Sequence, residues 1–390
     1  MGIDKNIMKI KIAHLQLLPL MSGVQKVTLD ELRFTNREWY DPWVICKEAG
    51  EFTEKIGGLN INVCLIPELT RKLNPLADLK SIIKLFIFFR NKNFDIVHTH
   101  SSKTGILGRL AAKLAGVPVI IHTVHGFAFP AARNPIEKFM YYFFEWIGSK
   151  CSTAVILLNK NDLLIAKNDL NVPDERLYLI PNGVDSDIYF YANYQERINN
   201  RKEKLNLYND SVAIGMVGRL WEQKNPECFV KAAIKSLTEN NLNANFYLIG
   251  DGELKESLQT LISNSGFESS IHILGWRSDV AEILRSLDIF VLPSRWEGLP
   301  LSILEAMASR LPVIASDIPG NRDLIDNEYD GFLFPSQDYI SLSKIINILS
   351  VSPELRAIMG GRGYLKIKQK FMIQDRMVLI NKLYKSLVKK

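Results

Sequence analysis

Two glutamates, Glu297 and Glu305, flank a predicted helix start at Pro300. Proline suits the first turn of a helix because its φ is already fixed and its missing N–H costs no hydrogen bond. The unpaired N–H groups and the positive dipole end of such a helix bind phosphate or sugar hydroxyls. Gly298 allows a ligand to come close. Helix rise separates the two carboxylates by roughly 7–8 Å, which suits one ligand held at both ends.

A second loop carries two cations. Arg219 and Lys224 follow Gly218 at the end of a predicted strand, 212–217. This is the edge at which open α/β sheets bind ligands. Arginine pairs with a diphosphate as a planar fork and lysine as a point charge. An Arg–Lys pair in a loop is usually just solvent-exposed, but the presence of Glu297 and Glu305 in the same predicted domain favours ligand binding.

His125 follows another predicted strand, 117–121, in a loop that begins at His122. The topology of a parallel sheet directs this loop to the carboxyl edge of the first domain, so His125 is expected to face a cleft. The alternative is a loop histidine whose hydrogen bonds are satisfied locally.

Histidines also raise the question of a metal. His98 and His100 have strand spacing, which places both rings on one face, and His122 or His125 could join them. No carboxylate or cysteine in these loops completes a ligand set, so no metal is expected. Asp185 and Asp187 have an Asp-x-Asp spacing typical of metal motifs, but they follow a Pro-Asn-Gly turn, and capping or turn duty is expected instead.

Strand and helix patterns alternate along the whole chain, which predicts an α/β protein with two Rossmann-like domains and a cleft between them. The 390 residues are too many for one hydrophobic core. The predicted divisions are an N-terminal Rossmann-like domain (1–187), a polar linker with a short solvated helix (188–211), a C-terminal Rossmann-like domain (212–371) and a last helix (372–390) that returns to the N-terminal domain.

Composition excludes several classes of protein. No apolar run reaches the roughly 18–20 residues of a membrane span, and the first 20 residues lack signal-peptide features, so a cytoplasmic location is expected. The four cysteines are scattered and are expected to be buried, reduced thiols. The first predicted strand is not followed by Gly-x-Gly-x-x-Gly, which counts against a dinucleotide oxidoreductase.

Taken together, the motifs resemble those of family-four retaining glycosyltransferases of the GT-B fold, of the type that makes bacterial surface polysaccharides. The matching blocks, in order, are Gly218-Arg219 with Lys224, Gly250 to Leu254, Leu274-Gly275-Trp276, Pro293-Ser294, and Glu297 to Glu305 with Gly298-Leu299-Pro300 between them.

The resemblance implies that the N-terminal domain (1–187) binds the acceptor and the C-terminal domain (212–371) binds the nucleotide sugar, and it implies a role for each matching residue. Glu297 would lie against the donor sugar, and Glu305 would take the two ribose hydroxyls. Arg219 and Lys224 would hold the diphosphate. Backbone N–H groups from Gly298 through Leu299, Pro300 and Leu301 would meet sugar hydroxyls and phosphate, apart from proline, which has none. His125 would contact the donor sugar across the gap between the domains.

The first loop departs from the family pattern. Ser22 stands where the family has the first of two glycines, and Gly23 keeps the second. Approach of an acceptor or a phosphate to this backbone is expected to remain possible.

Charge is distributed unevenly. Residues 71–160 carry thirteen Lys/Arg against four Asp/Glu, net +9, while 161–360 sum to −10. A predicted helix, 76–91, mixes basic residues with leucines, isoleucines and phenylalanines. Core packing would explain many of these apolar residues, but an anionic bilayer also attracts such a segment. We expect this segment to contact the inner face of the plasma membrane, whereas the apolar run 139–146 is expected to be buried. Nucleic acid is not an expected partner, because no binding module is present.

These features predict a metal-independent retaining glycosyltransferase. It would move a hexose or N-acetylhexosamine from a nucleotide diphosphate sugar, UDP-linked by expectation, to a lipid-linked or saccharide acceptor. Two alternatives remain open: a UDP-sugar epimerase on the same architecture, and a non-catalytic nucleotide-sugar binder that recruits partners to a membrane. Incubation with labelled UDP-sugars and no acceptor separates the three hypotheses. Epimerised sugar would indicate the epimerase, slow release of free sugar and UDP the glycosyltransferase, and binding without any reaction the non-catalytic binder.

Overall fold

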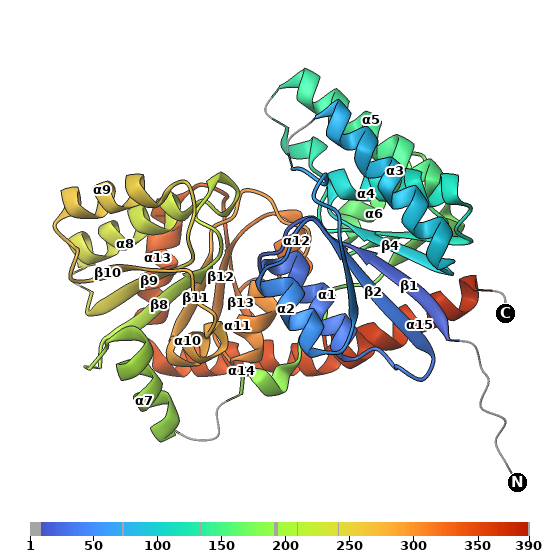
Figure 1. The fold of residues 1–390 in the computed structure, drawn as a ribbon. Coiled ribbons are helices and arrows are strands. Elements are labelled where there is room, and N and C mark those ends of the chain that lie inside the picture. The colour runs from blue at the N-terminus through green and yellow to red at the C-terminus, as the bar shows by residue number, and fades with distance from the viewer. Residues whose placement is uncertain are drawn as a thin grey trace, which may run out of the picture. The chain divides into compact units, whose positions relative to one another are not determined.

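The computed structural model describes residues 9–71, 74–132, 134–190, 194–208, 210–240 and 242–388 (Figure 1). Some sequence-based predictions concern residues outside these ranges. They are 1–8, in the segment examined for a signal peptide, 72, 73 and 133 in the basic stretch, and 191–193 and 209 in the predicted linker. The chain forms two compact units. Unit 1 comprises Met1–Asn182 and Ile373–Lys390, and unit 2 comprises Gly183–Met372.

Unit 1 is built on a seven-stranded parallel sheet with the order β3-β2-β1-β4-β5-β6-β7. The strands are β1 (Ile10–Leu15), β2 (Tyr40–Cys46), β3 (Asn62–Leu65), β4 (Ile96–His100), β5 (Val119–Val124), β6 (Ala154–Leu157) and β7 (Leu177–Leu179). The order reverses between β1 and β4. Loops that leave these two strands at their carboxyl ends therefore diverge, and ligands of open α/β sheets bind at such a point.

Helices cover both faces of this sheet. One face carries α3 (Pro75–Lys92), α4 (Ser102–Ala115), α5 (Pro135–Cys151) and α6 (Lys160–Asn168), and the other carries α1 (Gly23–Arg33), α2 (Glu51–Gly58) and α15 (Ile373–Leu387). Figure 1 shows α3, α4 and α5 side by side. Two of these helices begin with an Asn-Pro pair. The side chains of Asn74 and Asn134 accept backbone N–H bonds in the first turn, a cap that stabilises a helix by about 1 kcal/mol.

Unit 2 has a six-stranded parallel sheet with the order β10-β9-β8-β11-β12-β13. The strands are β8 (Val212–Val217), β9 (Ala244–Ile249), β10 (Ile271–Gly275), β11 (Ile289–Leu292), β12 (Val313–Ser316) and β13 (Gly331–Phe334). Its order reverses between β8 and β11. The loops after β8 and β11 are the two that carry the predicted cations and Glu297.

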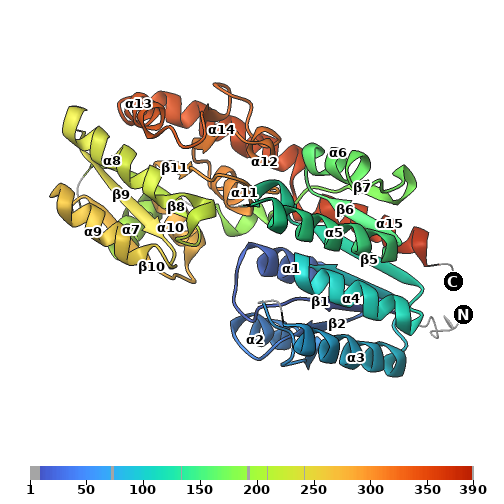
Figure 2. The ribbon, with the colours of Figure 1, turned by 90° about the horizontal axis from the view of Figure 1, so that it is seen from above.

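The helices of unit 2 are α7 (Tyr194–Leu205), α8 (Pro226–Asn240), α9 (Lys255–Ser265), α10 (Val280–Ser286), α11 (Leu301–Ala308), α12 (Pro319–Arg322), α13 (Tyr339–Ser350) and α14 (Pro353–Lys370). In Figure 2, α8 and α9 lie together beside β9 and β10. A core of buried side chains joins α8, α9 and α13 to one face of the sheet. Leu287, just after α10, packs against Gly215 of β8, where a side chain would collide with it.

Several boundaries differ from those expected. The helix α2 was not predicted from the sequence. The strand β5 runs to Val124 because Thr123 still pairs with β4, and Thr123 and Val124 pair with β6. His122 is therefore a strand residue rather than the start of a loop. The predicted linker contains a helix, α7, as expected, but this helix is not simply solvated, because its Arg197 and Arg201 pair with Asp288 of unit 2. The change of unit falls after Asn182, and the Val184 N–H donates to the Phe371 carbonyl within unit 2.

The last helix, α15, belongs to unit 1 and carries a buried ion pair. Arg376 donates to Oε1 of Glu31 on α1 at 2.6 and 2.8 Å, and the two side chains are 1% and 2% exposed. The same guanidinium donates to the backbone carbonyls of Ile180 and Pro181. One side chain thus joins α15 to α1 and to the segment after β7.

Replacing Arg376 tests this anchor. Arg376→Met leaves the Glu31 carboxylate buried without its cation, so we expect a loss of about 3–5 kcal/mol in the free energy of unfolding of unit 1. Arg322→Met is the matched control, because the Arg322–Asp317 pair is 57% and 40% exposed and should contribute at most about 1 kcal/mol. Urea unfolding followed by circular dichroism measures both, and equal small losses would contradict the anchor.

Candidate active site

The two loops at the reversal point of unit 2 are joined by hydrogen bonds. The loop after β8 ends in a short 3-10 turn, Glu222–Lys224. The Gln223 side-chain amide donates to the Trp296 carbonyl at 2.9 Å, and the Arg295 N–H donates to the Gln223 carbonyl at 2.8 Å. Gln223 was not among the predicted site residues, because nothing in its local sequence indicates a partner about seventy residues away.

Lys224 and Glu297 meet where these loops come together. The Lys224 ammonium contacts Oε1 of Glu297, and the Ser294 hydroxyl donates to the same oxygen at 2.7 Å. The side chains of Lys224 and Glu297 are 18% and 8% exposed. The structure thus brings together two predicted site residues as an ion pair that is mostly shielded from water.

Arg219 lies in a more open position. Its guanidinium is 3.5 Å from Oε2 of Glu253, and the two side chains are 44% and 58% exposed. It also stacks on the Trp221 ring at 4.7 Å from the centroid. Exposed pairs of this kind contribute little to stability, so the guanidinium can exchange its partner for a ligand at small cost.

Glycines hold the loop that carries Arg219. Gly250 has φ +149, and a Cβ there would lie 2.0 Å from the Gly218 carbonyl oxygen. A Cβ on Gly252 would lie 2.4 Å from the Leu220 carbonyl oxygen. The Leu220 N–H donates to the Asp251 carbonyl at 3.0 Å. Only glycine permits these two backbone segments to approach so closely.

The helix after the second loop starts one residue later than expected. Pro300 is the N-cap, with φ −67 and ψ 118, and α11 begins at Leu301. The side chains of Leu299 and Leu301 are buried, at 4% and 8% exposure. Gly298 is held close to Gly320, where any side chain would meet the Gly298 carbonyl at 2.2 Å.

Glu305 is buried within α11 rather than on its surface. It is 7% exposed, and its Oε1 accepts a hydrogen bond of 2.6 Å from the Tyr189 hydroxyl. Tyr189 follows a 3-10 turn, Ser186–Ile188, more than a hundred residues earlier. A contact so distant in sequence leaves no local signal, and Tyr189 was not predicted.

His125 is the first residue after β5 in unit 1 and is partly exposed. Desolvation, and then the nearby Arg376 charge, lower the pKa of His125 to about 3. Its Nε2 lies 3.4 Å from Nδ1 of His100. At neutral pH the ring is therefore an uncharged hydrogen-bonding group.

The expected pairing of His98 and His100 on one face of β4 is confirmed, since their rings stack at 4.3 Å. His122 points to the opposite face, where its Nδ1 is 2.9 Å from the Thr99 hydroxyl. His125 contacts His100, whereas the groups that surround the pair closely enough to share a metal ion are His14 of β1 and Glu31 of α1.

In this cluster one nitrogen or oxygen from each of His14, Glu31, His98 and His100 lies within 4.8 Å of the others. These donors suit a transition metal. Both nitrogens of His98 are engaged, however, with the Tyr384 and Thr123 hydroxyls at 2.7 Å each. The geometry therefore fits a hydrogen-bonded cluster better than a ligand set.

The first loop places Ser22 as the N-cap of α1, with its hydroxyl on the Gln25 side chain. Gly23 opens the helix, is exposed, and has nothing within 4 Å of where a Cβ would lie. Packing within unit 1 therefore does not require a glycine at this position.

Asp185 lies in a turn, and the four cysteines form no disulfide. The turn role of Asp185 is confirmed, since its side chain accepts the Asp187 N–H. All four cysteines are free thiols, of which Cys46 and Cys228 are buried. Cys64 and Cys151 are only partly buried, so the expectation of buried thiols holds for two of four.

Apolar side chains are exposed on both α3 and α5. The exposed residues are Leu76, Leu79, Ile83, Phe86 and Ile87 on α3, and Ile136, Phe139, Phe143 and Trp146 on α5. The expectation that 139–146 is buried is wrong. The helix α5 turns Gly148 toward the buried Arg109 guanidinium, and this leaves Phe139, Phe143 and Trp146 stacked in a row on the outside.

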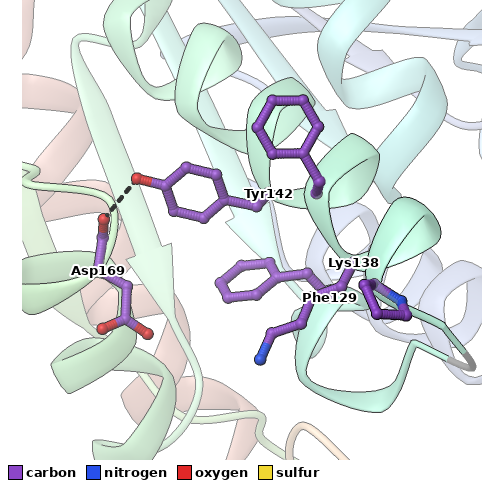
Figure 3. A pocket seen from close by; sticks show the side chains of 6 residues that line it. Phe129, Lys138, Tyr142 and Asp169 are labelled. Carbon is purple, nitrogen blue, oxygen red and sulfur yellow. Dashed lines mark hydrogen bonds between the residues drawn. The ribbon is translucent and has the colours of Figure 1, made fainter.

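Beside this row lies an open hollow (Figure 3). It is lined mainly by carbon atoms of Phe129, Pro135, Lys138, Phe139, Tyr142 and Asp169. The Tyr142 hydroxyl closes one side by donating to the Asp169 carbonyl at 2.9 Å.

None of the helices in the described ranges is long and apolar enough to cross a bilayer.

Comparison with known proteins identifies the family. Residues 21–188 match "Glycosyltransferase Family 4", and residues 197–366 match "Glycosyl transferases group 1". An Escherichia coli UDP-Gal:alpha-D-GlcNAc-diphosphoundecaprenol alpha-1,3-galactosyltransferase is 43% identical over 365 residues, covering 90% of this chain and 93% of that protein. The chain is a family-four glycosyltransferase.

Two further matches to this glycosyltransferase have lower sequence identity. A Campylobacter jejuni N,N'-diacetylbacillosaminyl-diphospho-undecaprenol alpha-1,3-N-acetylgalactosaminyltransferase is 29% identical and covers 78% of this chain and 81% of its own length. Anabaena HepE, solved with UDP and glucose, shares the fold with a TM-score of 0.84 at 19% identity, over 97% of this chain and 100% of that one. The predicted GT-B fold, with two Rossmann-like domains, is thereby confirmed.

The glycine at position 250 gives a direct test of the loop arrangement in this glycosyltransferase. Gly250→Ala forces a side chain onto the Gly218 carbonyl, so we expect a loss of about 2–4 kcal/mol in stability and weaker binding of UDP. Gly266→Ala is the control, because φ is +73 but the surroundings are open, and should cost about 1–2 kcal/mol without affecting UDP. Denaturant unfolding and calorimetry measure both, and equal effects of the two changes would contradict the argument.

Proposed function

We propose that this glycosyltransferase moves a hexose or N-acetylhexosamine from a UDP-sugar, with retention of configuration, to a sugar carried on a polyprenyl diphosphate. The observation that carries the proposal is the 43% identity, over nine tenths of the chain, to an enzyme named for transfer of galactose from UDP to such an acceptor. UDP-galactose is therefore the first donor to test. The product would extend a lipid-linked precursor of a surface polysaccharide.

In this proposal unit 2 binds the donor. Glu305 accepts hydrogen bonds from the two ribose hydroxyls, since a carboxylate oxygen can take more than one donor. Its contact with Tyr189 supports this role, because the hydroxyl holds the carboxylate, which lies one turn inside α11, in one position. Backbone N–H groups at Gly298, Leu299 and Leu301 receive sugar hydroxyls and phosphate at the helix N-terminus.

The two cations neutralise the diphosphate. Arg219 exchanges Glu253 for a phosphate oxygen, and Lys224 reaches the other phosphate from its place beside Glu297. Glu297 and His125 contact the donor sugar. Charge grows on the diphosphate as the bond from the sugar C1 to the phosphate oxygen breaks, and fixed cations stabilise that charge most in the transition state.

The proposed reaction needs no metal ion and no enzymatic nucleophile. The acceptor hydroxyl attacks C1 from the face that UDP leaves, and its proton passes to the departing phosphate oxygen. One C–O bond forms as another breaks, which gives UDP and a glycoside of unchanged anomeric configuration. Exclusion of water would protect the donor from hydrolysis.

We propose further that unit 1 works against the inner face of the plasma membrane. The exposed apolar residues of α3 and α5 are accompanied by exposed Lys80, Lys84 and Arg90 on α3, in a stretch of net charge +9. Apolar side chains that enter a headgroup layer and cations that meet anionic lipids reinforce one another. A lipid-linked acceptor would be collected at the same surface.

An assay of purified enzyme with UDP-galactose and a synthetic N-acetylglucosaminyl diphosphate lipid tests the proposed reaction. We expect a disaccharide lipid whose new linkage has the α configuration by nuclear magnetic resonance, and full activity in excess chelator. A β linkage, dependence on a divalent cation, or epimerised sugar nucleotide without transfer would contradict the proposal. Other UDP-sugars in parallel define the donor.

Arg219 gives a second prediction. Arg219→Ala should lower kcat about a hundredfold, because a guanidinium that stabilises developing charge acts mainly in the transition state. Arg322→Ala, which removes another exposed and paired arginine of unit 2, should leave kcat unchanged. A wild-type kcat for Arg219→Ala would remove this residue from the mechanism.

Membrane contact is tested separately with vesicles of phosphatidylglycerol and phosphatidylethanolamine. The double change Phe139→Ser, Phe143→Ser should weaken binding about tenfold, because it removes two exposed rings. Leu365→Ser, at an exposed apolar position of α14 in unit 2, is the control. High salt should also weaken binding of the wild type. Equal binding by all three proteins would contradict a role for α5.

A further inference from the structure

Three imidazoles of unit 1 form a row that ends at His125. Nδ1 of His14 lies 3.3 Å from Nε2 of His100, and Nδ1 of His100 lies 3.4 Å from Nε2 of His125. His14 and His100 come from β1 and β4, the adjacent strands at which the order of the sheet reverses. Both are buried, at 3% and 0% exposure, while His125 is partly exposed. The row therefore connects the interior to the carboxyl edge of the sheet.

All three rings are neutral at physiological pH. Burial lowers the pKa of His14 to about 4 and, with the Arg376 charge, that of His125 to about 3, and burial also lowers the pKa of His100 well below its usual value. A neutral imidazole has one donor nitrogen and one acceptor nitrogen. His100 bonds through both nitrogens, so it must donate to one neighbour and accept from the other. The two hydrogen bonds consequently run in the same direction.

Glu31 sets that direction. It is 2% exposed and acceptor-only, and among the described residues its Oε2 has no hydrogen-bond partner. One of its carboxylate oxygens lies within 4.8 Å of a ring nitrogen of His14 and of a ring nitrogen of His100. His98 and His100 already use both of their ring nitrogens, so the Nε2–H of His14 is the ring donor left for this buried oxygen, and Nδ1 of His14 must then accept. The His125 Nε2–H then donates to His100, and the His100 Nε2–H donates to His14.

We propose that His100 is a positioning residue that holds His125 as its Nε2–H tautomer, so that Nδ1 of His125 accepts a hydrogen bond from a hydroxyl of the donor sugar. This inference rests on the proposed function of His125. A sugar hydroxyl that donates to the unprotonated Nδ1 can still accept a hydrogen bond from another group. The row of histidines therefore determines that this hydroxyl is the donor, and not the acceptor, in its hydrogen bond to His125.

His98 provides a natural comparison within the same cluster. It is as buried as His100 and its ring stacks on that of His100. Its two nitrogens, however, meet the hydroxyls of Tyr384 and Thr123 rather than other histidines. Changes at His98 should disturb packing without altering the tautomer of His125.

Two substitutions at His100 separate its two contacts. An asparagine amide can occupy the place of Nδ1, which faces His125, and a glutamine amide the place of Nε2, which faces His14. His100→Asn should keep kcat within about threefold of wild type, while His100→Gln should lower it at least about tenfold, since the hydrogen bond that orients His125 is lost. The dissociation constant of UDP, which lacks the sugar, should change in neither. His98→Gln is the control for destabilisation and should keep kcat.

The tautomer can be observed directly, with or without a stable variant. The chain has only six histidines, so ¹⁵N-histidine labelling gives few signals, which single substitutions assign. Two-bond proton–nitrogen correlations of the wild type should show His125 protonated at Nε2 and bare at Nδ1. A proton on Nδ1, an imidazolium, or one equivalent of bound zinc by elemental analysis would overturn the proposal.

The kinetic outcomes distinguish this inference from the proposed function. Wild-type turnover of His125→Phe would remove His125 from the mechanism and the inference with it. Slow turnover of His125→Phe together with wild-type turnover of His100→Gln would leave the proposed function intact and overturn the positioning role of His100.

Discussion

The contact between Lys224 and Glu297 sets the geometry of unit 2 at the point where its strand order reverses. It ties the loop after β8 to the loop after β11, and Ser294 and Gln223 reinforce the connection. Because the pair is largely shielded from water, losing either partner would leave a poorly solvated charge. A ligand that draws the lysine away must therefore offer negative charge to the ammonium and hydrogen-bond donors to the carboxylate, and a diphosphate carrying a sugar with several hydroxyls has both.

The same topology carries different chemistry in the two units. In unit 2 the loops at the reversal point present charged groups, and an exposed arginine can exchange partners cheaply. In unit 1 the reversal point holds neutral histidines whose charged forms are disfavoured by burial. One unit is suited to bind an anion and the other to recognise hydroxyl groups. This division agrees with transfer of a sugar from a nucleotide diphosphate.

Much of this arrangement could be predicted from the sequence. Strand ends followed by glycine, paired carboxylates and paired cations are local patterns, and they placed Glu297, Arg219 and Lys224 on loops at one edge of a sheet. His14, Glu31 and Tyr189 could not be predicted, because their contacts depend on strand register and on helix packing across long sequence separations. A strand end misplaced by a few residues also put His122 in a loop, whereas pairing continues to Val124. The exposed face of α5 was missed since its aromatic residues occur on nearly every side, and only the packing of Gly148 against Arg109 decides which side is inside.

The central claim is that Glu305 receives the ribose of a bound nucleotide. Calorimetric titration of the intact enzyme with UDP and with 2′-deoxy-UDP tests it most directly. The account predicts that the deoxy nucleotide binds about tenfold more weakly, as expected for loss of one hydrogen bond to a charged acceptor, and that Glu305→Gln removes most of this difference. Equal affinities of the wild type for the two nucleotides, or no heat with UDP, would contradict it.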